Sequence, residues 1–137
     1  MLMSDLSIIV RGGQVFSTRK LSEYDLNAGE QAVLMYLLGH DESNQESIAK
    51  FYMLDKGSIA RTLAKLESKG FIERKINDDN QREKIITLTQ KSMDIKDVLT
   101  DLLTEWNDLM YEGISEDEIK EFELITSRIA INISNKL

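Results

Sequence analysis

The spacing of the apolar residues changes from helical to alternating at Gly70. In the segment 56–69, apolar residues recur at intervals of four and three, which predicts a helix with one buried face. A glycine directly after such a segment favours the end of the helix. Beyond Gly70, apolar and polar residues alternate in the segments 71–76 and 84–88, which predicts two strands. The polar segment 77–83 between them predicts that the two strands form a hairpin.

Two more helices are predicted before this pattern, each from a capping signature. Residues 27–30, Asn-Ala-Gly-Glu, have the form of a capping box and open an apolar segment that ends at Gly39. Residues 43–46 repeat the signature, with Ser43 as the expected N-cap of a short helix. Asp55 is placed to cap the helix described above. Three helices followed by a hairpin form a winged helix-turn-helix, which we assign to residues 27–89.

Amphipathic segments flank this region on both sides. Apolar residues at loosely helical spacing predict a first helix over residues 5–22, interrupted by the pair Gly12-Gly13. Over residues 89–112 the apolar residues advance by threes and fours, which predicts one amphipathic helix. Residues 115–118 form another capping box, which opens a final helix with an apolar stripe.

The predicted fold is therefore mainly α with a small β-hairpin wing, in a single domain of 137 residues. The helix over residues 89–112 is long enough to extend beyond the compact winged domain, so part of its apolar stripe needs cover. The first and last helices of this chain and of a second copy can provide it. We therefore expect residues 1–24 and 90–137 to form a helical dimerisation region.

Composition excludes most catalytic chemistry. The chain has no cysteine, which excludes disulfides, thiolate nucleophiles and Cys-based metal sites. Its single histidine, His40, cannot form a His-rich metal site, and its place at a predicted helix end favours a capping or solvated role. The stripe that contains Trp106 is interpreted as packing, so no cofactor is expected. No nucleophile and base, metal cluster or phosphate loop has usable spacing, so we do not expect an enzyme.

The sequence also favours a cytoplasmic location. No apolar run approaches the roughly 20 residues that cross a bilayer. Residues 1–11 lack the basic region and the small-residue cleavage site of a secretion signal.

Charge is distributed unevenly along the chain. The net charge of −7 by itself opposes binding to nucleic acid. Residues 45–91, however, hold ten Lys and Arg against seven Asp and Glu, whereas residues 92–137 hold four against eleven. DNA phosphates respond to the local charge of a surface, and acidic flanks repel DNA from the wrong faces. The acidic total is therefore compatible with duplex binding through the basic middle.

The order of these elements and two motifs resemble the MarR family of bacterial transcription regulators, over nearly the whole chain. The longer motif, residues 55–74, is similar to the family's recognition helix and the strand after it. The shorter one, Asn80-Gln81-Arg82 followed by Leu88-Thr89, corresponds to the Asp-x-Arg of the wing and its closing Leu-Thr. The wing aspartate of the family is Asn80 here, so its pairing with the arginine is either weakened or taken over by Asp79.

We expect the recognition helix to enter the major groove of duplex DNA and the wing to lie at the minor groove. Arg61 is the best candidate for a bidentate contact to guanine, and Arg82 suits the minor groove or its phosphates. Gln45 is a candidate phosphate contact from the preceding helix. The alternative for these residues is an ordinary solvated polar face. The candidate set is Gln45, Lys56, Gly57, Ser58, Ala60, Arg61, Thr62, Lys65, Arg74, Arg82 and Lys84.

The resemblance implies a homodimer on a pseudo-palindromic operator, with repression as the commoner output. It also implies a pocket for a small aromatic ligand, whose binding changes the spacing of the two recognition helices. Phe16, Arg19 and Tyr36 are candidate wall residues, with core or surface packing as an equal alternative. The rival function is a winged-helix module that binds another protein and not DNA. A steep loss of duplex affinity with added salt would favour DNA binding over this rival.

Overall fold

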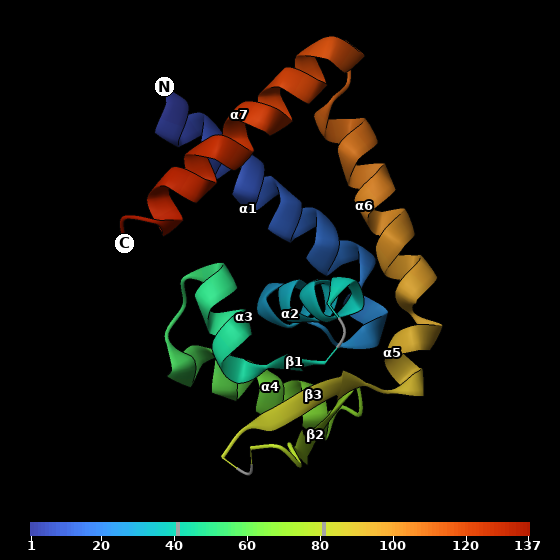
Figure 1. Cartoon of the computed structure of the whole chain (residues 1–137). Coiled ribbons are helices and arrows are strands. Elements are labelled where there is room, and N and C mark those ends of the chain that lie inside the picture. Colours follow the sequence, from blue (N-terminus) through green and yellow to red (C-terminus); the bar gives the residue numbers. More distant parts are fainter. Residues whose placement is uncertain (41, 81) are drawn as a thin grey trace. The chain divides into compact units, whose positions relative to one another are not determined.

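The computed structural model describes residues 1–40, 42–80 and 82–137. Within it the chain forms two compact units, residues 1–103 and residues 104–137 (Figure 1). The first unit contains a helix-turn-helix and a small sheet, and the second consists of helix alone.

The first unit begins with a long helix and a short turn. Helix α1 is Leu2–Lys20, and the 3-10 helix η1, Ser22–Tyr24, follows it. The predicted first helix is confirmed, and the pair Gly12-Gly13 lies inside it without ending it. An internal glycine costs only about 1 kcal/mol against alanine, which a helix of this length tolerates. Leu21, between α1 and η1, is fully buried and fixes this corner in the core.

Helix α2, Ala28–Gly39, begins where the capping signature predicts it. Oδ1 of Asn27 accepts a hydrogen bond from the backbone N–H of Glu30 at 2.9 Å. The capping box is complete on that side only, because the Glu30 carboxylate bonds Lys69 instead of the cap backbone. The predicted helix and its N-cap Asn27 are therefore confirmed. The second hydrogen bond of the predicted box, from the Asn27 backbone to the Glu30 carboxylate, is wrong.

Helix α3, Gln45–Tyr52, has a full capping box, one residue later than predicted. Asn44 is the N-cap: its Oδ1 accepts the Ser47 N–H at 2.8 Å, and Ser47 Oγ accepts the Asn44 N–H at 3.3 Å. The prediction of Ser43 as N-cap is wrong, because the helix begins at Gln45 and the residue before it is Asn44.

Helix α4, Lys56–Ser68, ends in a Schellman motif. The N–H of Phe71 donates to the carbonyl of Leu66 at 2.9 Å, and the N–H of Gly70 donates to the carbonyl of Glu67 at 3.0 Å. Gly70 has a φ of +81°, the left-handed conformation that this motif requires and that glycine adopts most easily. The end of the helix at Gly70 is thus confirmed.

The sheet has three antiparallel strands in the order β1-β3-β2. The predicted hairpin is confirmed as β2, Ile72–Ile76, and β3, Lys84–Leu88, with Ile72 opposite Leu88. The third strand β1, Ser43–Asn44, pairs with β3 and has no counterpart in the sequence analysis. Two residues are too few to display an alternating pattern, so only pairing in the folded chain identifies this strand.

A single hydrophobic cluster joins these elements. Helix α4 packs against α2 and α3 and contacts β2 at its end (Figure 1). The predicted inward residues of α4, Ile59, Leu63 and Leu66, are all buried, which confirms that face of the helix. The fully buried apolar residues of the cluster are Leu21, Leu34, Ile48, Ile59, Leu63, Leu66, Phe71, Ile72, Ile86 and Leu99.

After the sheet the sequence predicts one uninterrupted helix, whereas the structure has two. Helix α5 is Gln90–Asp94, and helix α6 is Lys96–Met110. Ile95 between them has φ −97° and ψ 2°, outside the helical region. The hydroxyl of the buried Ser92 donates to the carbonyl of Phe71, which fixes α5 against the start of the sheet. Such a tertiary contact leaves no trace in the helical spacing, so the prediction of one helix is wrong.

The second unit contains the end of α6 and the helix α7, Glu116–Ser134. The predicted capping box at its start is confirmed. Ser115 Oγ accepts the Glu118 N–H at 3.2 Å, and the Ser115 N–H donates to Glu118 Oε2 at 3.1 Å. The hydrogen bond from the Ser115 backbone lowers the pKa of the Glu118 carboxyl.

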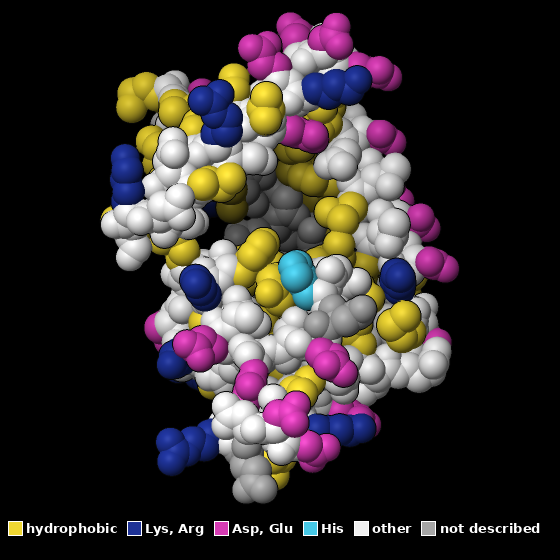
Figure 2. All heavy atoms as spheres, viewed as in Figure 1, with side chains coloured by type: hydrophobic (Ala, Val, Ile, Leu, Met, Phe, Trp, Pro, Cys, Tyr) yellow, Lys and Arg dark blue, Asp and Glu magenta, His cyan; other side chains and the backbone are white. Residues whose placement is uncertain are grey.

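Helix α7 exposes an apolar stripe in the single chain. Phe122, Ile125 and Ile129 are 42%, 45% and 50% exposed. Acidic side chains gather where α6 ends and α7 begins (Figure 2). Within the described part of the chain, no helix combines the length and the apolar character needed to span a bilayer.

Candidate nucleic-acid interface

Asp55 organises the N-terminus of α4. Its Oδ1 accepts the backbone N–H of Ser58 at 2.8 Å, and its Oδ2 accepts the Ser58 hydroxyl at 2.9 Å. The predicted cap is therefore confirmed. The pKa of the Asp55 carboxyl is lowered, mainly by the hydrogen bond from the Ser58 backbone and next by the hydrogen bond from the Ser58 hydroxyl. Ser58 Oγ also accepts a hydrogen bond from Nη2 of Arg61 at 3.2 Å, so the exposed guanidinium is held beside the helix start.

Gly57 leaves room for this arrangement. A Cβ at this position would lie 3.1 Å from Oδ1 of Asp55 and 3.4 Å from Nη1 of Arg61. Gly57 belongs to the candidate set for DNA contact. The structure gives it an internal role as well, because a larger residue would press on the capping carboxylate.

The outer face of α4 carries the remaining predicted residues of the recognition helix. Lys56, Arg61 and Lys65 are exposed, whereas Ser58, Ala60 and Thr62 are half-buried. The Thr62 hydroxyl donates to the carbonyl of Ser58 at 3.1 Å. Its proton is therefore used inside the helix, and only its oxygen lone pairs remain for a partner.

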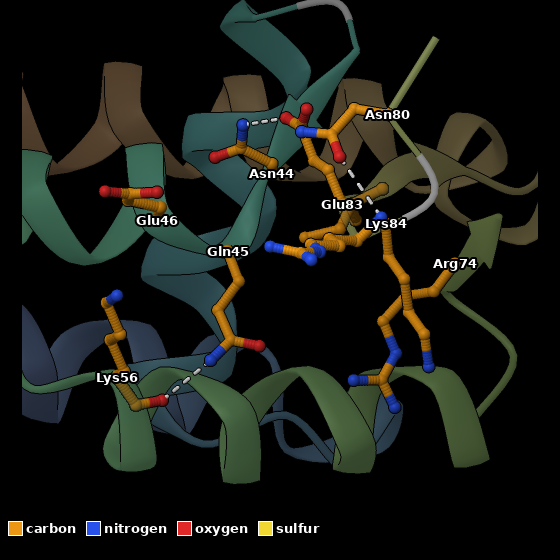
Figure 3. A pocket seen from close by; sticks show the side chains of 10 residues that line it. Asn44, Gln45, Glu46, Lys56, Arg74, Asn80, Glu83 and Lys84 are labelled. Atoms are coloured by element: carbon orange, nitrogen blue, oxygen red, sulfur yellow. Dashed lines mark hydrogen bonds between the residues drawn. The ribbon is translucent and has the colours of Figure 1, made fainter. Parts of the chain in front are cut away.

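A cleft of about 650 Å³ opens between the start of α4 and the wing (Figure 3). It brings together five of the predicted residues, which come from α3, α4, both strands of the hairpin and the loop between the strands. The cleft is lined by Asn44, Gln45, Glu46, Lys56, Arg74, Asn80, Arg82, Glu83, Lys84 and Ile86. Four of these side chains are cationic and two are anionic. Asn44, Glu46 and Glu83 are not predicted from the sequence, because nothing in the local pattern shows that α3 faces the wing.

Gln45 connects the starts of the two helices of the helix-turn-helix. Its Nε2 donates to the backbone carbonyl of Lys56 at 3.0 Å (Figure 3). The side chain is half-buried in this position. The bond fixes the N-terminus of α4 against that of α3, so Gln45 shapes the cleft from within the protein.

Arg74 is paired within the protein. Its Nη2 lies 2.9 Å from Oε1 of Glu67 and its Nε lies 3.3 Å from Oε2, a two-pronged contact. Hydrogen bonding between the partners raises the pKa of Arg74 and lowers the pKa of Glu67. Much of its charge is therefore balanced before any ligand arrives, unlike that of Lys56 on the same cleft.

The wing is held by amide side chains. Gln81, the middle residue of the short wing motif, lies outside the described residues. Oδ1 of Asn80 accepts the backbone N–H of Arg82 at 3.2 Å, and Oδ1 of Asn77 accepts that of Asp79 at 3.0 Å. Among the described residues, the Arg82 side chain makes no ion pair, so the family's aspartate–arginine pairing is absent and Asp79 does not supply it.

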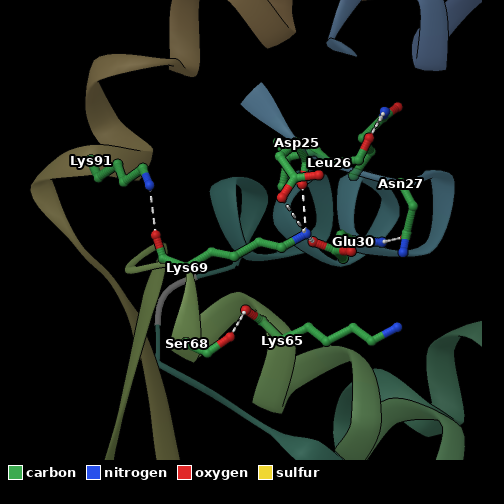
Figure 4. Close-up of polar contacts among 9 residues, drawn as sticks. Asp25, Leu26, Asn27, Glu30, Lys65, Ser68, Lys69 and Lys91 are labelled. Atoms are coloured by element: carbon green, nitrogen blue, oxygen red, sulfur yellow. Dashed lines mark hydrogen bonds and ion pairs between the residues drawn. The ribbon is translucent and has the colours of Figure 1, made fainter. Parts of the chain in front are cut away.

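A buried ion pair fixes the far end of α4. Glu30 in α2 is 1% exposed, and its Oε2 lies 2.7 Å from Nζ of Lys69 (Figure 4). The same ammonium donates to the backbone carbonyl of Asp25 at 2.5 Å. The hydrogen bond to Glu30 raises the pKa of Lys69. This ion pair is not predicted from the sequence, where Glu30 is interpreted only as part of a capping box.

The predicted ligand-wall residues lie on two helices, outside the cleft. Phe16 and the exposed Arg19 are on α1, and Phe16 packs against the core. Tyr36 on α2 stacks on His40 with ring centroids 3.9 Å apart. Nδ1 of His40 lies 2.8 Å from the carbonyl of Tyr36, so His40 bonds the end of the helix it caps. A ligand role for Phe16, Arg19 and Tyr36 stays a prediction.

Comparison with known proteins identifies relatives of this arrangement. A sequence profile described as the MarR family matches residues 26–84. The HTH-type transcriptional regulator SarZ of Staphylococcus haemolyticus is 31% identical over 103 residues, which cover 74% of this chain and 67% of SarZ. The regulator BilQ of Clostridium symbiosum is 26% identical over 84% of this chain and 80% of its own length.

Solved structures resemble nearly the whole chain. A crystal structure of MarR is 34% identical, with a TM-score of 0.87 over 98% of this chain and 92% of that one. A MarR family transcriptional regulator from Listeria monocytogenes, complexed with 26mer DNA, has a TM-score of 0.92 over 97% of this chain and 89% of its own. Its identity of 22% makes that likeness one of fold.

Proposed function

Because this chain belongs to the MarR family of helix-turn-helix transcription regulators, which are not enzymes, we propose that it binds double-stranded DNA sequence-specifically. In this proposal α4 enters the major groove and the hairpin wing lies at the minor groove. The output we expect is repression of transcription in the cytoplasm.

The cleft between α4 and the wing carries the proposal. Four cationic side chains line it, in a chain whose net charge is −7. Clustered cations with nearby amide donors suit a phosphate backbone, because neutralising phosphates releases counterions. The structural neighbour from Listeria monocytogenes was solved in complex with DNA, which supports a duplex as the occupant.

Sequence readout then falls to the outer face of α4. The guanidinium of Arg61 is exposed and held beside the helix start by Ser58. A planar donor at this place can make two hydrogen bonds to guanine in the major groove. The exposed Arg82 of the wing suits the narrow minor groove or its phosphates. Lys56 and Lys65 would contact phosphates of the DNA backbone on either side of the major groove.

We propose that the active species is a homodimer. Helix α7 exposes its apolar stripe in the single chain, and α1 exposes Ile8 and Val10 at 70% and 61%. Exposed apolar helix faces of this kind are buried in two-fold dimers. A two-fold dimer requires a pseudo-palindromic operator with half-sites about 10 bp apart.

Release by a small aromatic ligand completes the proposal. Phe16, Arg19 and Tyr36 are the candidate wall residues. Such a ligand would bind more tightly to a conformation in which the spacing of the two recognition helices does not match the operator. The loss of DNA affinity cannot exceed this difference in ligand affinity between the two conformations.

Selection from a random duplex pool at two salt concentrations tests the proposed function. The comparison protein is the double variant Arg61→Ala, Arg82→Ala, which leaves the core intact because both side chains are exposed. We expect enrichment of a pseudo-palindrome that the variant loses, with affinity that falls steeply as salt rises. No enrichment at low salt would refute DNA binding and favour a winged-helix module that binds another protein.

A further inference from the structure

The wing is attached to the N-terminus of α3 through the carboxylate of Glu83. Its Oε1 accepts a hydrogen bond from Nδ2 of Asn44 (Figure 3). Its Oε2 accepts one from Nδ2 of Asn77 at 3.1 Å. Oδ1 of Asn44 at the same time accepts the backbone N–H of Ser47 at 2.8 Å. One amide therefore caps α3 and holds the wing.

Backbone hydrogen bonds place Glu83 within the wing loop itself. Its carbonyl accepts the N–H of Asn77 at 2.9 Å, and its N–H donates to the carbonyl of Asn80 at 3.0 Å. Glu83 directly follows Arg82, whose N–H is bonded by Asn80. The side chain of Glu83 therefore extends from the same hydrogen-bonded segment of backbone that carries Arg82.

We propose that Glu83 is the positioning residue of the wing, and this inference rests on the proposed binding of duplex DNA. The contacts Asn44–Glu83–Asn77, here termed the wing clasp, fix the wing tip relative to the start of α3. Because Gln45 bonds the start of α4 to that of α3, the clasp also sets the separation between Arg82 and α4. It takes the place of the aspartate–arginine pairing that Asn80 cannot make.

Electrostatics alone predicts the opposite role for Glu83. Its negative charge lines a cleft that would hold phosphates, so an unbonded carboxylate there would repel DNA. Removing a merely solvated acid would therefore tighten binding, whereas removing the clasp would weaken it. The sign of the change separates the two roles.

Glu46 provides a matched control. It lines the same cleft, is exposed, and has no hydrogen-bonding or ionic partner for its carboxylate among the described residues. Glu46→Ala and Glu83→Ala each remove one negative charge from the cleft. Asn77→Ala removes its contact to Glu83 without any change in charge, together with the hydrogen bond from the Asp79 N–H. Glu83→Gln keeps the shape but loses one acceptor oxygen.

The experiment measures the affinity of each full-length variant for the duplex selected above, at one salt concentration. We expect Glu83→Ala and Asn77→Ala to bind the duplex roughly three- to tenfold more weakly than the wild type, and Glu83→Gln to have an affinity between those of the wild type and Glu83→Ala. Glu46→Ala should bind more tightly than the wild type, because it removes a negative charge that faces the phosphates. In an Arg82→Ala background, Glu83→Ala should cause no further loss, because the residue it positions is gone.

Amide hydrogen exchange without DNA gives an independent readout. We expect Glu83→Ala to speed exchange at the N–H of Asn77, with thermal unfolding confirming that the core stays folded. If Glu83→Ala binds the duplex as well as Glu46→Ala does, the positioning role is wrong while DNA binding stands. If the wild-type chain binds no duplex at all, the proposed function itself is wrong, and the positioning role is refuted with it.

Discussion

Nζ of Lys69, at the C-cap of α4, lies 2.7 Å from Oε2 of Glu30, a buried carboxylate in the first turn of α2. The two residues are 39 positions apart in the chain. An ionised carboxylate out of water is costly unless it is paired, so the contact holds the end of α4 at one place on α2. It thereby fixes the C-terminal end of the recognition helix α4, whereas Asp55 caps the N-terminal end.

We predict that Lys69→Met lowers the free energy of unfolding by about 2 kcal/mol, because it leaves the buried carboxylate of Glu30 without its ionic partner. The loss stays below that for a fully buried pair, because Lys69 is 25% exposed and water already screens the interaction. Urea denaturation of both proteins measures the difference. Lys65→Met, an exposed position on the same helix, is the matched control and should change stability little.

The second substitution Glu30→Gln should recover part of that loss. A neutral amide in place of the carboxylate leaves no buried charge without a partner. If the double variant is less stable than Lys69→Met alone, the cost lies in lost packing and the ion pair is not the cause.

Alkaline pH should weaken the folded state through the same lysine. The hydrogen bond to Glu30 raises the pKa of Lys69, so its contribution is complete below the unfolded value of about 10.4 and disappears as pH rises through the folded one. Burial raises the pKa of Tyr52 and acts in the same direction. We therefore compare unfolding from pH 8 upward, and expect the wild type to lose more stability than the double variant Glu30→Gln, Lys69→Met.

Acid should weaken the start of α4 through Asp55. The hydrogen bond from the Ser58 backbone lowers the pKa of Asp55, so its contribution is present above the unfolded value of about 3.9 and is lost as pH falls through the folded one. Asp55→Asn keeps a capping oxygen but cannot titrate, and Asp55→Ala loses the cap. Thermal unfolding between about pH 2 and pH 7 should show Ala least stable at neutral pH, and Asn with less acid dependence than the wild type.

Gly70→Ala should lower the free energy of unfolding by about 1 kcal/mol. The φ of +81° at this position strains a residue with a Cβ, although Lys91 leaves room for one at 3.8 Å. Gly39→Ala is the control, because a Cβ there meets nothing among the described residues within 4 Å. Chemical denaturation that finds equal effects at the two glycines would contradict the conformational explanation.

Glu67→Gln should raise affinity for the selected duplex by roughly twofold. The substitution removes the charge that balances Arg74 and leaves the guanidinium available to a phosphate. Arg74→Ala should lower affinity less than Arg61→Ala, because Arg74 already has a partner. Fluorescence anisotropy titrations of all three variants decide this, and a weaker Glu67→Gln complex would mean that the pair orients Arg74 for binding.

The sequence by itself determined the order of the elements and the inward face of α4. Ile59, Leu63 and Leu66 sit at helical spacing, and a helix buries whichever face is apolar regardless of what covers it. The N-cap and the glycine C-terminus of α4 were predictable in the same way, because Asp55 and Gly70 act on backbone within four residues of themselves. The same local logic located the hairpin and the basic segment that carries Arg61 and Arg82.

Only the tertiary structure decided how these parts face one another. Residues 43 and 44 form strand β1 because they pair with β3. The helix breaks at Ile95, next to the contact of α5 with the start of the sheet. Glu30 and Glu83 have unremarkable sequence neighbours, yet each bonds a residue 39 positions away. A local sequence pattern reflects interactions between residues that are close along the chain. The contacts of Glu30 and Glu83 join residues that come close only after the core has packed, so the pattern does not contain them.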